Sequence, residues 1–300
     1  MNIKYISYKE IDFKKWDTCI LSSSCSLPYA LSFYLDATCE QNWDALVLED
    51  YTAVMPLPIR EKLGVSYVFQ PYFSQQLGIY STINLSQEQE ESFIKRIPSS
   101  IKYIDTYINY TNKIEGKLRC NLILDLQQSY ENIYIGFSDN LKRNLKKASK
   151  YPLVFEAIQE SEYLSFAKKI MLDEEKNKYS KEIYDLLVQL YKALDTNKML
   201  QAYAIKEGNS ILSVALFIVY KNRIINLAPF NSPIAKEKQA SAYLFDSIIK
   251  QYVNTSLILD FEGSEIAGVK NFYKQFGAIE QNYTHYKENR LPRLLRFLKK

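Results

Sequence analysis

The stretch from residue 256 to residue 278 constrains the fold of this chain more than any other. Residues 256–261 form a short apolar run whose length fits a buried strand. An acidic-glycine turn interrupts the run, and residues 267–276 then place apolar side chains at helical spacing. Gly277 follows, where a helix commonly ends on a left-handed residue. This order predicts an α/β protein, in which ligands bind beyond the carboxyl ends of the strands.

The same plan of strands and helices runs through the chain twice. The fold class that it predicts is α/β, with mixed sheets in two tandem domains covering 1–137 and 138–300. Only the order of strands and helices repeats, because sequence identity between the halves is not visible. The first half has predicted strands at 3–8, 43–49, 51–60, 67–71, 101–109 and 121–126, and helices at 11–19, 30–39 and 86–97; the second half has strands at 153–158, 199–206, 211–220 and 223–229, and helices at 161–172, 182–194 and 239–252.

Composition excludes several kinds of active site. The chain has one histidine, His285, which excludes a two-histidine metal site and argues against Ser-His-Asp or Cys-His catalysis, so no metal is expected. The four cysteines have no C-x-x-C spacing and read as reduced, buried thiols. No segment approaches 18 apolar residues, and the first residues lack a signal-peptide pattern. We therefore expect a cytoplasmic protein without a transmembrane segment.

Residues 271–277, Asn-Phe-Tyr-Lys-Gln-Phe-Gly, resemble the last helix of the GNAT acyltransferases, where an Asn-rich helix ends in a Tyr followed shortly by Gly. Together with residues 260–263, Asp-Phe-Glu-Gly, the stretch is similar to the FemAB-like branch, which carries two GNAT-like repeats in one chain. The resemblance implies an N-acyltransferase that moves an acyl group from acetyl-CoA or another acyl-CoA thioester to an amine. It also implies that the C-terminal repeat is catalytic and that the N-terminal repeat completes the acceptor pocket.

In GNAT enzymes the pyrophosphate of the donor sits on backbone N–H groups at a helix start. The matching segment lies just before residue 243, and Pro229 is expected on the opposite wall of the donor slot. The family's glycines are missing, which puts ordinary coenzyme A binding in doubt, and the small residues equally suit a tight helix–sheet contact. The predicted donor-binding residues are Lys236, Lys238, Gln239, Ala240, Ser241 and Ala242.

Tyr273 matches the GNAT position whose phenol protonates the departing thiolate, although it also fits a core aromatic. A phenol with a pKa near 10 keeps its proton at neutral pH. In Fem transferases that use aminoacyl-tRNA, a Lys commonly stands here, so Tyr273 favours a thioester donor. Glu262, on the turn before the helix, is the predicted base or amine anchor.

Several polar residues are candidates for binding the acceptor substrate, and each also has a structural interpretation. Asp260 and Ser264 flank the turn and are equally suited to capping backbone N–H groups there. A polar and aromatic loop at 72–78 is predicted to line a cleft. The predicted substrate-binding residues are Asp260, Ser264, Tyr72, Gln75 and Gln76.

A basic helix is predicted between the two halves. It is either a solvated face or a contact for tRNA, since phosphates favour Lys and Arg gathered on one surface. A FemAB-like aminoacyl-tRNA-dependent transferase acting on a peptidoglycan precursor or peptide is the alternative function, and a non-catalytic ligand-binding protein is a third. The cationic residues of this helix are Lys142, Arg143, Lys146, Lys147 and Lys150.

Overall fold

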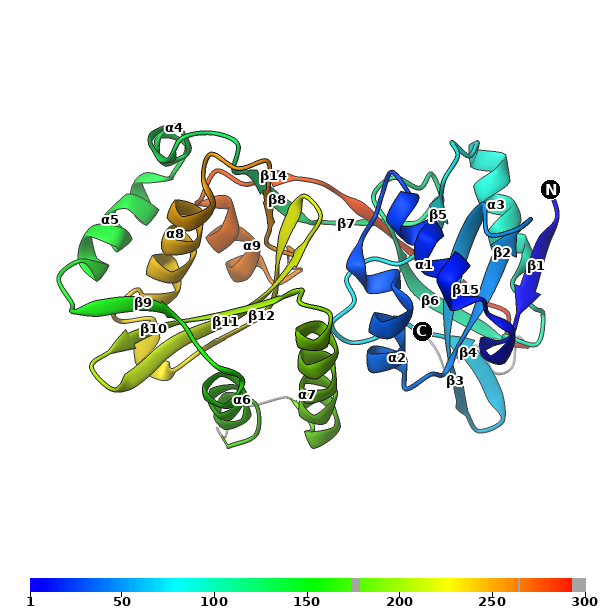
Figure 1. The fold of residues 1–300 in the computed structure, drawn as a ribbon, viewed down its shortest axis with the longest axis horizontal. Helices are drawn as coiled ribbons and strands as arrows, with labels where there is room; N and C mark the ends of the chain where they lie inside the picture. Colours follow the sequence, from blue (N-terminus) through cyan, green and yellow to red (C-terminus); the bar gives the residue numbers. More distant parts are fainter. Residues whose placement is uncertain (174–178, 264, 293–300) are drawn as a thin grey trace. The chain divides into compact units, whose positions relative to one another are not determined.

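The computed structural model describes residues 1–173, 179–263 and 265–292 (Figure 1). It divides into two compact units, one of residues 1–119 with 282–300 and one of residues 120–281. These bounds differ from the predicted division at 137/138 because two strands pair away from their sequence neighbours. Strand β8 (Leu122–Asp125) pairs with β13 and β14 in the second unit, whereas β15 (Tyr283–Asn289) pairs with β6 and β7 in the first.

The first unit is built on one mixed sheet with strand order β1-β2-β3-β4-β6-β15-β7, and β5 pairs with β3. Its core is aliphatic, with Leu46, Leu57 and Ile104 fully buried. Its other elements are β1 (Ile3–Ile6), β2 (Trp43–Leu48), β3 (Ala53–Lys62), β4 (Val65–Val68), β5 (Tyr80–Ser81), β6 (Tyr103–Ile108), β7 (Lys117–Arg119), α1 (Phe13–Ser22), α2 (Ser32–Cys39) and α3 (Gln87–Arg96).

The second unit is a sheet of order β14-β8-β13-β12-β11-β10-β9 with helices on both faces. Figure 1 shows α5, α8 and α9 over one face and α6 and α7 over the other. Its strands are β9 (Leu153–Ala157), β10 (Leu200–Glu207), β11 (Ser210–Tyr220), β12 (Arg223–Asn231), β13 (Ile258–Asp260) and β14 (Ile279–Glu280), and its helices are α4 (Tyr130–Ile135), α5 (Asp139–Ala148), α6 (Glu160–Lys168), α7 (Lys181–Thr196), α8 (Ala240–Tyr252) and α9 (Ala267–Lys274).

Local chemistry explains where several helices begin. The Ser86 side chain accepts from the Gln89 N–H, and the Gln89 side chain reaches back to the Ser86 N–H, so α3 starts with a capping box. The Ser138 hydroxyl accepts from the Leu141 N–H at the start of α5. These serines satisfy N–H groups that a helix leaves unpaired in its first turn.

The core of the second unit is aromatic where α8, α9 and the end of β13 meet. The Phe245 ring lies 5.5 Å from Phe261 and 6.0 Å from Phe276, and Phe261 and Phe276 are almost fully buried. The predicted apolar face of residues 269–276 thus packs into the core. Among the helices of the described residues, none has the length and apolar character needed to cross a bilayer.

Candidate active site

The site begins where strand β12 parts from strand β13. The two strands pair in parallel only over residues 223–225 and 258–260. β12 stays paired with β11 as far as Asn231, and a register shift in that ladder leaves Leu227 as an extra residue on β12. Bulges of this kind are common beside active sites. Beyond Ile225, the edge of β12 that faces away from β11 has no partner strand among the described residues, so its backbone polar groups are available to a ligand.

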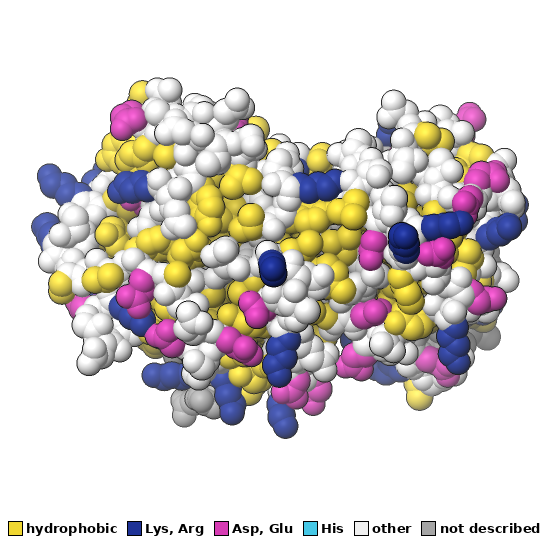
Figure 2. Space-filling view, viewed as in Figure 1, with side chains coloured by type: hydrophobic (Ala, Val, Ile, Leu, Met, Phe, Trp, Pro, Cys, Tyr) yellow, Lys and Arg dark blue, Asp and Glu magenta, His cyan; other side chains and the backbone are white. Residues whose placement is uncertain are grey.

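A cavity of about 590 Å³ adjoins this open edge. Its walls are β11 at 213–215, β12 at Pro229 and Asn231, the turn leading into α8, and α9 at 268–273. Figure 2 shows hydrophobic side chains gathered over the region of α8 and α9. A space of this size, largely apolar with a few polar groups, suits a small organic ligand.

Tyr273 lines the cavity from α9 and is only 5% exposed. Its ring stacks on Phe261 at 4.8 Å between centroids, and its hydroxyl oxygen accepts a 3.0 Å hydrogen bond from the Asn226 amide nitrogen. Burial raises the pKa of Tyr273 well above its ordinary value; the Asn226 bond opposes this rise and the Glu262 charge adds to it. The phenol therefore holds its proton, and because its oxygen is the acceptor toward Asn226, that proton can be donated elsewhere.

Asn226 was not among the predicted site residues. It lies beside the bulge of β12, is 2% exposed, and its side-chain oxygen has no hydrogen-bond partner in the part of the chain that the structure describes. A buried amide oxygen without a partner is costly unless a ligand or water completes it. The available signal was a lone amide within the apolar run 224–230.

The start of helix α8 forms another wall of the cavity. Gln239 precedes the helix with a left-handed φ of 58° and makes no side-chain cap. The first N–H groups of α8, at 240–242, have no acceptor among the described residues, and such groups with the helix dipole attract anions. Lys236 also lines the cavity and is exposed. These groups fit a pyrophosphate despite the missing glycines.

The predicted donor residues divide into two sets. Lys236, Gln239, Ser241, Ala242 and Pro229 line the cavity, and Ser241 also donates a 2.6 Å bond to the Asn231 side chain, whereas Ala240 is fully buried. Lys238 forms an ion pair with Glu207, and its amino group lies 5.2 Å from the centre of the Tyr151 ring. Lys238 is therefore held away from the cavity by its own partners.

The acidic turn holds one buried ion pair. Asp260 accepts a 2.6 Å bond from Arg223, with side chains 2% and 5% exposed, and its other oxygen accepts from the Glu262 N–H at 2.9 Å. The Asp260 carboxylate is thus engaged in structure. Glu262 is half-buried with a left-handed φ of 60°, near enough to Tyr273 to affect its pKa but not among the residues that line the cavity. Ser264 lies outside the described residues.

The other predicted substrate-binding residues belong to the first unit. Tyr72 is 52% exposed, whereas Gln75 and Gln76 are buried. The Gln76 amide donates to the Gln75 side chain at 2.7 Å and accepts from the Tyr110 N–H at 3.0 Å. The two glutamines therefore hold the 72–78 loop in place.

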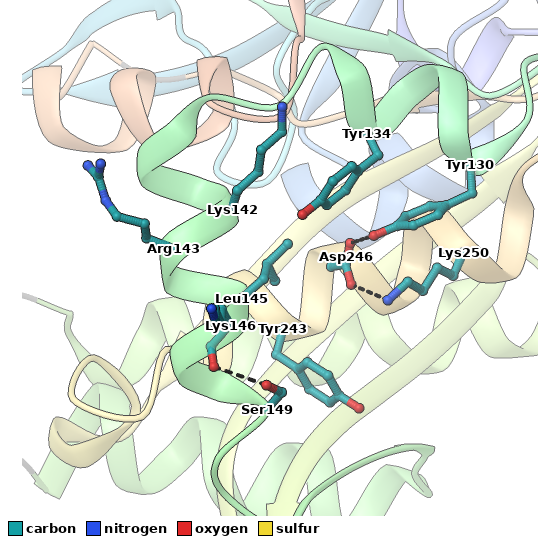
Figure 3. A pocket seen from close by; sticks show the side chains of 10 residues that line it. All are labelled: Tyr130, Tyr134, Lys142, Arg143, Leu145, Lys146, Ser149, Tyr243, Asp246 and Lys250. Carbon is teal, nitrogen blue, oxygen red and sulfur yellow. Dashed lines mark hydrogen bonds and ion pairs between the residues drawn. The ribbon is translucent and has the colours of Figure 1, made fainter.

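The predicted basic helix is α5, which ends at Ala148, so Lys150 lies beyond it and the helix carries four of the five predicted cations. Three of these, Lys142, Arg143 and Lys146, line a separate groove of about 540 Å³ (Figure 3). Lys147 and Lys150 are exposed and do not line it. Within the described ranges, no group of three or more His, Cys, Asp or Glu side chains is arranged to hold a metal ion.

No protein-family model matches the chain, and no curated protein matches it. Among solved structures, FemX is similar with a TM-score of 0.70 at 12% identity, with all of both chains covered. The structure of L-PGS from Bacillus licheniformis has a TM-score of 0.54 at 10% identity, covering 95% of this chain and 94% of that one. A tandem GNAT protein from the clavulanic acid biosynthesis pathway has a TM-score of 0.52 at 8% identity, covering 97% and 99%. At these identities the likeness establishes the fold, and it confirms the predicted one: an α/β chain with two GNAT-like domains in tandem.

Proposed function

We propose that the second unit is an N-acyltransferase that moves an acyl group from an acyl-CoA-type thioester, such as acetyl-CoA, to an amine. The observation that supports this proposal most is that three groups needed for acyl transfer border one cavity. The uncapped start of α8, the unpaired edge of β12 and the phenol of Tyr273 all border the same 590 Å³ space. Acyl transfer needs an anchor for the donor, a contact for the carbonyl oxygen and an acid for the leaving group.

The donor is anchored at the start of α8. Its phosphates lie against the N–H groups of residues 240–242, with Lys236 contributing positive charge. Its acyl arm then runs between β12 and α9, past Pro229. A backbone N–H on the free edge of β12 donates to the thioester carbonyl oxygen and stabilises the negative charge that develops there.

The reaction forms one bond and breaks another. The amine nitrogen attacks the thioester carbon, a C–N bond forms and the C–S bond breaks. Tyr273 gives its proton to the departing thiolate, and Glu262, which lies outside the lining of the cavity, takes through a water molecule the proton that the nitrogen loses. Return of that proton through water to the phenolate restores both groups for the next turnover.

Aminoacyl transfer from tRNA is a second candidate, and the groove along α5 is the observation that favours it. In this version the donor is an ester on the RNA end, and a peptide or peptidoglycan precursor supplies the amine. The likeness to FemX supports it, whereas Tyr273 in place of the family's common Lys supports the thioester. The four free, buried cysteines support a reducing, cytoplasmic setting for either reaction.

Thermal unfolding with candidate donors separates these functions. A ligand that binds only the folded chain raises the melting temperature with its concentration. We expect stabilisation by acetyl-CoA and a Tyr273→Phe variant that keeps this stabilisation but loses turnover. Stabilisation by aminoacyl-tRNA and not by acetyl-CoA supports the second candidate. If neither donor stabilises the chain, it is a non-catalytic binding protein and the acyltransferase proposal fails.

A further inference from the structure

A second concave site lies between α4, α5 and α8. It is the groove of about 540 Å³ that Figure 3 shows, and every residue that lines it belongs to the second unit. None of these residues lines the cavity described above. The groove is therefore a separate site, and its ligand can be argued independently.

The groove is strongly cationic. Lys142, Arg143, Lys146 and Lys250 line it, against one carboxylate, Asp246. Lys146 is exposed and has no carboxylate partner among the described residues. Unpaired cations gathered on one concave surface favour a ligand with negative charge.

Asp246 offsets only the charge of Lys250, with which it forms an ion pair, and it leaves Lys142, Arg143 and Lys146 uncompensated among the described residues of the groove. It is 2% exposed, and its two oxygens accept from the Tyr130 hydroxyl at 2.7 Å and from the Lys250 amino group at 2.6 Å, as drawn in Figure 3. The carboxylate thus fixes a phenol and an ammonium in position beneath the groove.

Three tyrosine rings complete the lining. The Lys250 amino group lies 4.8 Å from the centre of the Tyr130 ring, and the Lys142 amino group lies 5.3 Å from that of Tyr134. The third ring, that of Tyr243 on α8, is half-exposed. Aromatic faces next to cations are the combination that binds a base beside its phosphate.

We propose that this groove is a nucleotide-binding site, with the phosphate against Lys142 and Lys146 and the base against the Tyr243 ring. An inorganic anion would use the lysines and leave the rings without a role. A bilayer is broad and flat, and it would not enter a concave site. The same chemistry is offered by a free mononucleotide and by the end of a single RNA strand, and these two sources are distinguished by measurement.

The experiment uses the full chain and titrates it with adenosine monophosphate, a short single-stranded RNA and inorganic pyrophosphate, with binding followed by calorimetry. Lys142→Gln and Lys146→Gln are each expected to weaken nucleotide binding about three- to tenfold, since each removes a charge-assisted contact. Tyr243→Leu is expected to weaken it about fivefold or more through lost stacking. Lys147→Gln and Lys150→Gln are the matched controls, because they lie on the same basic segment but outside the groove, and both are expected to change binding less than about twofold.

Comparable affinity for the mononucleotide and the RNA identifies a free nucleotide as the ligand. Tighter RNA binding that weakens steeply between about 50 mM and about 200 mM salt identifies the strand end. The proposal is overturned if neither binds, if the control variants lose as much affinity as the groove variants, or if pyrophosphate binds as well as the nucleotides and Tyr243→Leu has no effect. These outcomes do not depend on turnover or on acetyl-CoA binding, so they do not test the thioester-dependent acyltransferase proposal; only the RNA outcome bears on the second candidate function.

Discussion

The side-chain amide of Asn226 donates a hydrogen bond to the hydroxyl oxygen of Tyr273, joining the bulged strand β12 to the last helix of the second unit. This contact decides how the Tyr273 hydroxyl can act. Its oxygen accepts the hydrogen bond from Asn226, so its hydrogen is free to be donated to another group. The same amide carries an oxygen with no partner among the described residues. We therefore regard Asn226 as a positioning residue that acts through Tyr273.

Replacing Asn226 by Leu tests this role. The change removes the unpartnered acceptor, but it also takes from the buried Tyr273 hydroxyl the hydrogen bond that it accepts, so we expect a loss of about 1 to 3 kcal/mol in the free energy of unfolding. Without the amide, the phenol oxygen loses the donor that orients it, and we expect kcat to fall roughly tenfold to a hundredfold, as for loss of about 1.4 to 2.8 kcal/mol of transition-state stabilisation. Steady-state kinetics with acetyl-CoA measure it. A raised KM with unchanged kcat would instead mean that Asn226 only binds substrate.

The protonation of Tyr273 gives a prediction about pH. Its pKa is raised by burial, so the folded state favours the neutral phenol. The stability linked to this group is fully present below the ordinary tyrosine pKa of about 10 and is lost only as pH rises through the higher folded value. We expect wild type and Tyr273→Phe to show the same phenolate absorbance at pH about 10. They should separate only at higher pH, and earlier separation would show that the phenol is solvated.

Sequence patterns identified local features well and partnerships between distant residues poorly. Ser86 followed by Gln89 predicts the start of α3 because a capping box depends on four consecutive residues. The pattern of residues 256–278 likewise predicts a strand, a turn and a helix, and the structure has them at 258–274. The sequence left Asp260 open between a substrate contact and a cap for the turn, and the structure shows it accepting from the Glu262 N–H. Its ion pair with Arg223 could not be predicted, because the two residues are distant in the sequence and pairing between strands decides which residues meet. For the same reason, the sequence did not predict that β8 pairs in the sheet of the second unit and β15 in the sheet of the first.

The Asp260–Arg223 pair should behave as a buried ion pair. Asp260→Asn removes the carboxylate that pairs with the buried Arg223 guanidinium, and we expect a loss of about 3 to 5 kcal/mol in the free energy of unfolding. Denaturant unfolding measures it. The double variant Arg223→Met, Asp260→Leu removes both charges and should regain a large part of that loss. If Asp260→Asn is as stable as wild type but fails to use the amine substrate, Asp260 contacts substrate after all.

The glycine of the acidic turn is required by space as well as by backbone conformation. Gly263 has φ of 58°, and a Cβ there would lie 2.8 Å from the Cα of Asn121 and nearer still to the Cys120 carbonyl oxygen. Gly208, in the turn between β10 and β11, has φ of 55°, but a Cβ at that position would meet nothing within 4 Å, so it serves as the matched control. Gly208→Ala should lower the free energy of unfolding by about 1 to 2 kcal/mol, which is the cost of holding an alanine in a left-handed backbone conformation.

Gly263→Ala should cost at least about 2 kcal/mol more than Gly208→Ala in denaturant unfolding, because the backbone of the turn must move away from residues 120–121. That movement also displaces Glu262, so turnover should fall in the Gly263 variant and stay unchanged in the Gly208 variant. Equal losses of stability in the two variants would mean that the turn yields without strain. Unchanged turnover in Gly263→Ala, despite lost stability, would argue that Glu262 does not take the proton from the amine.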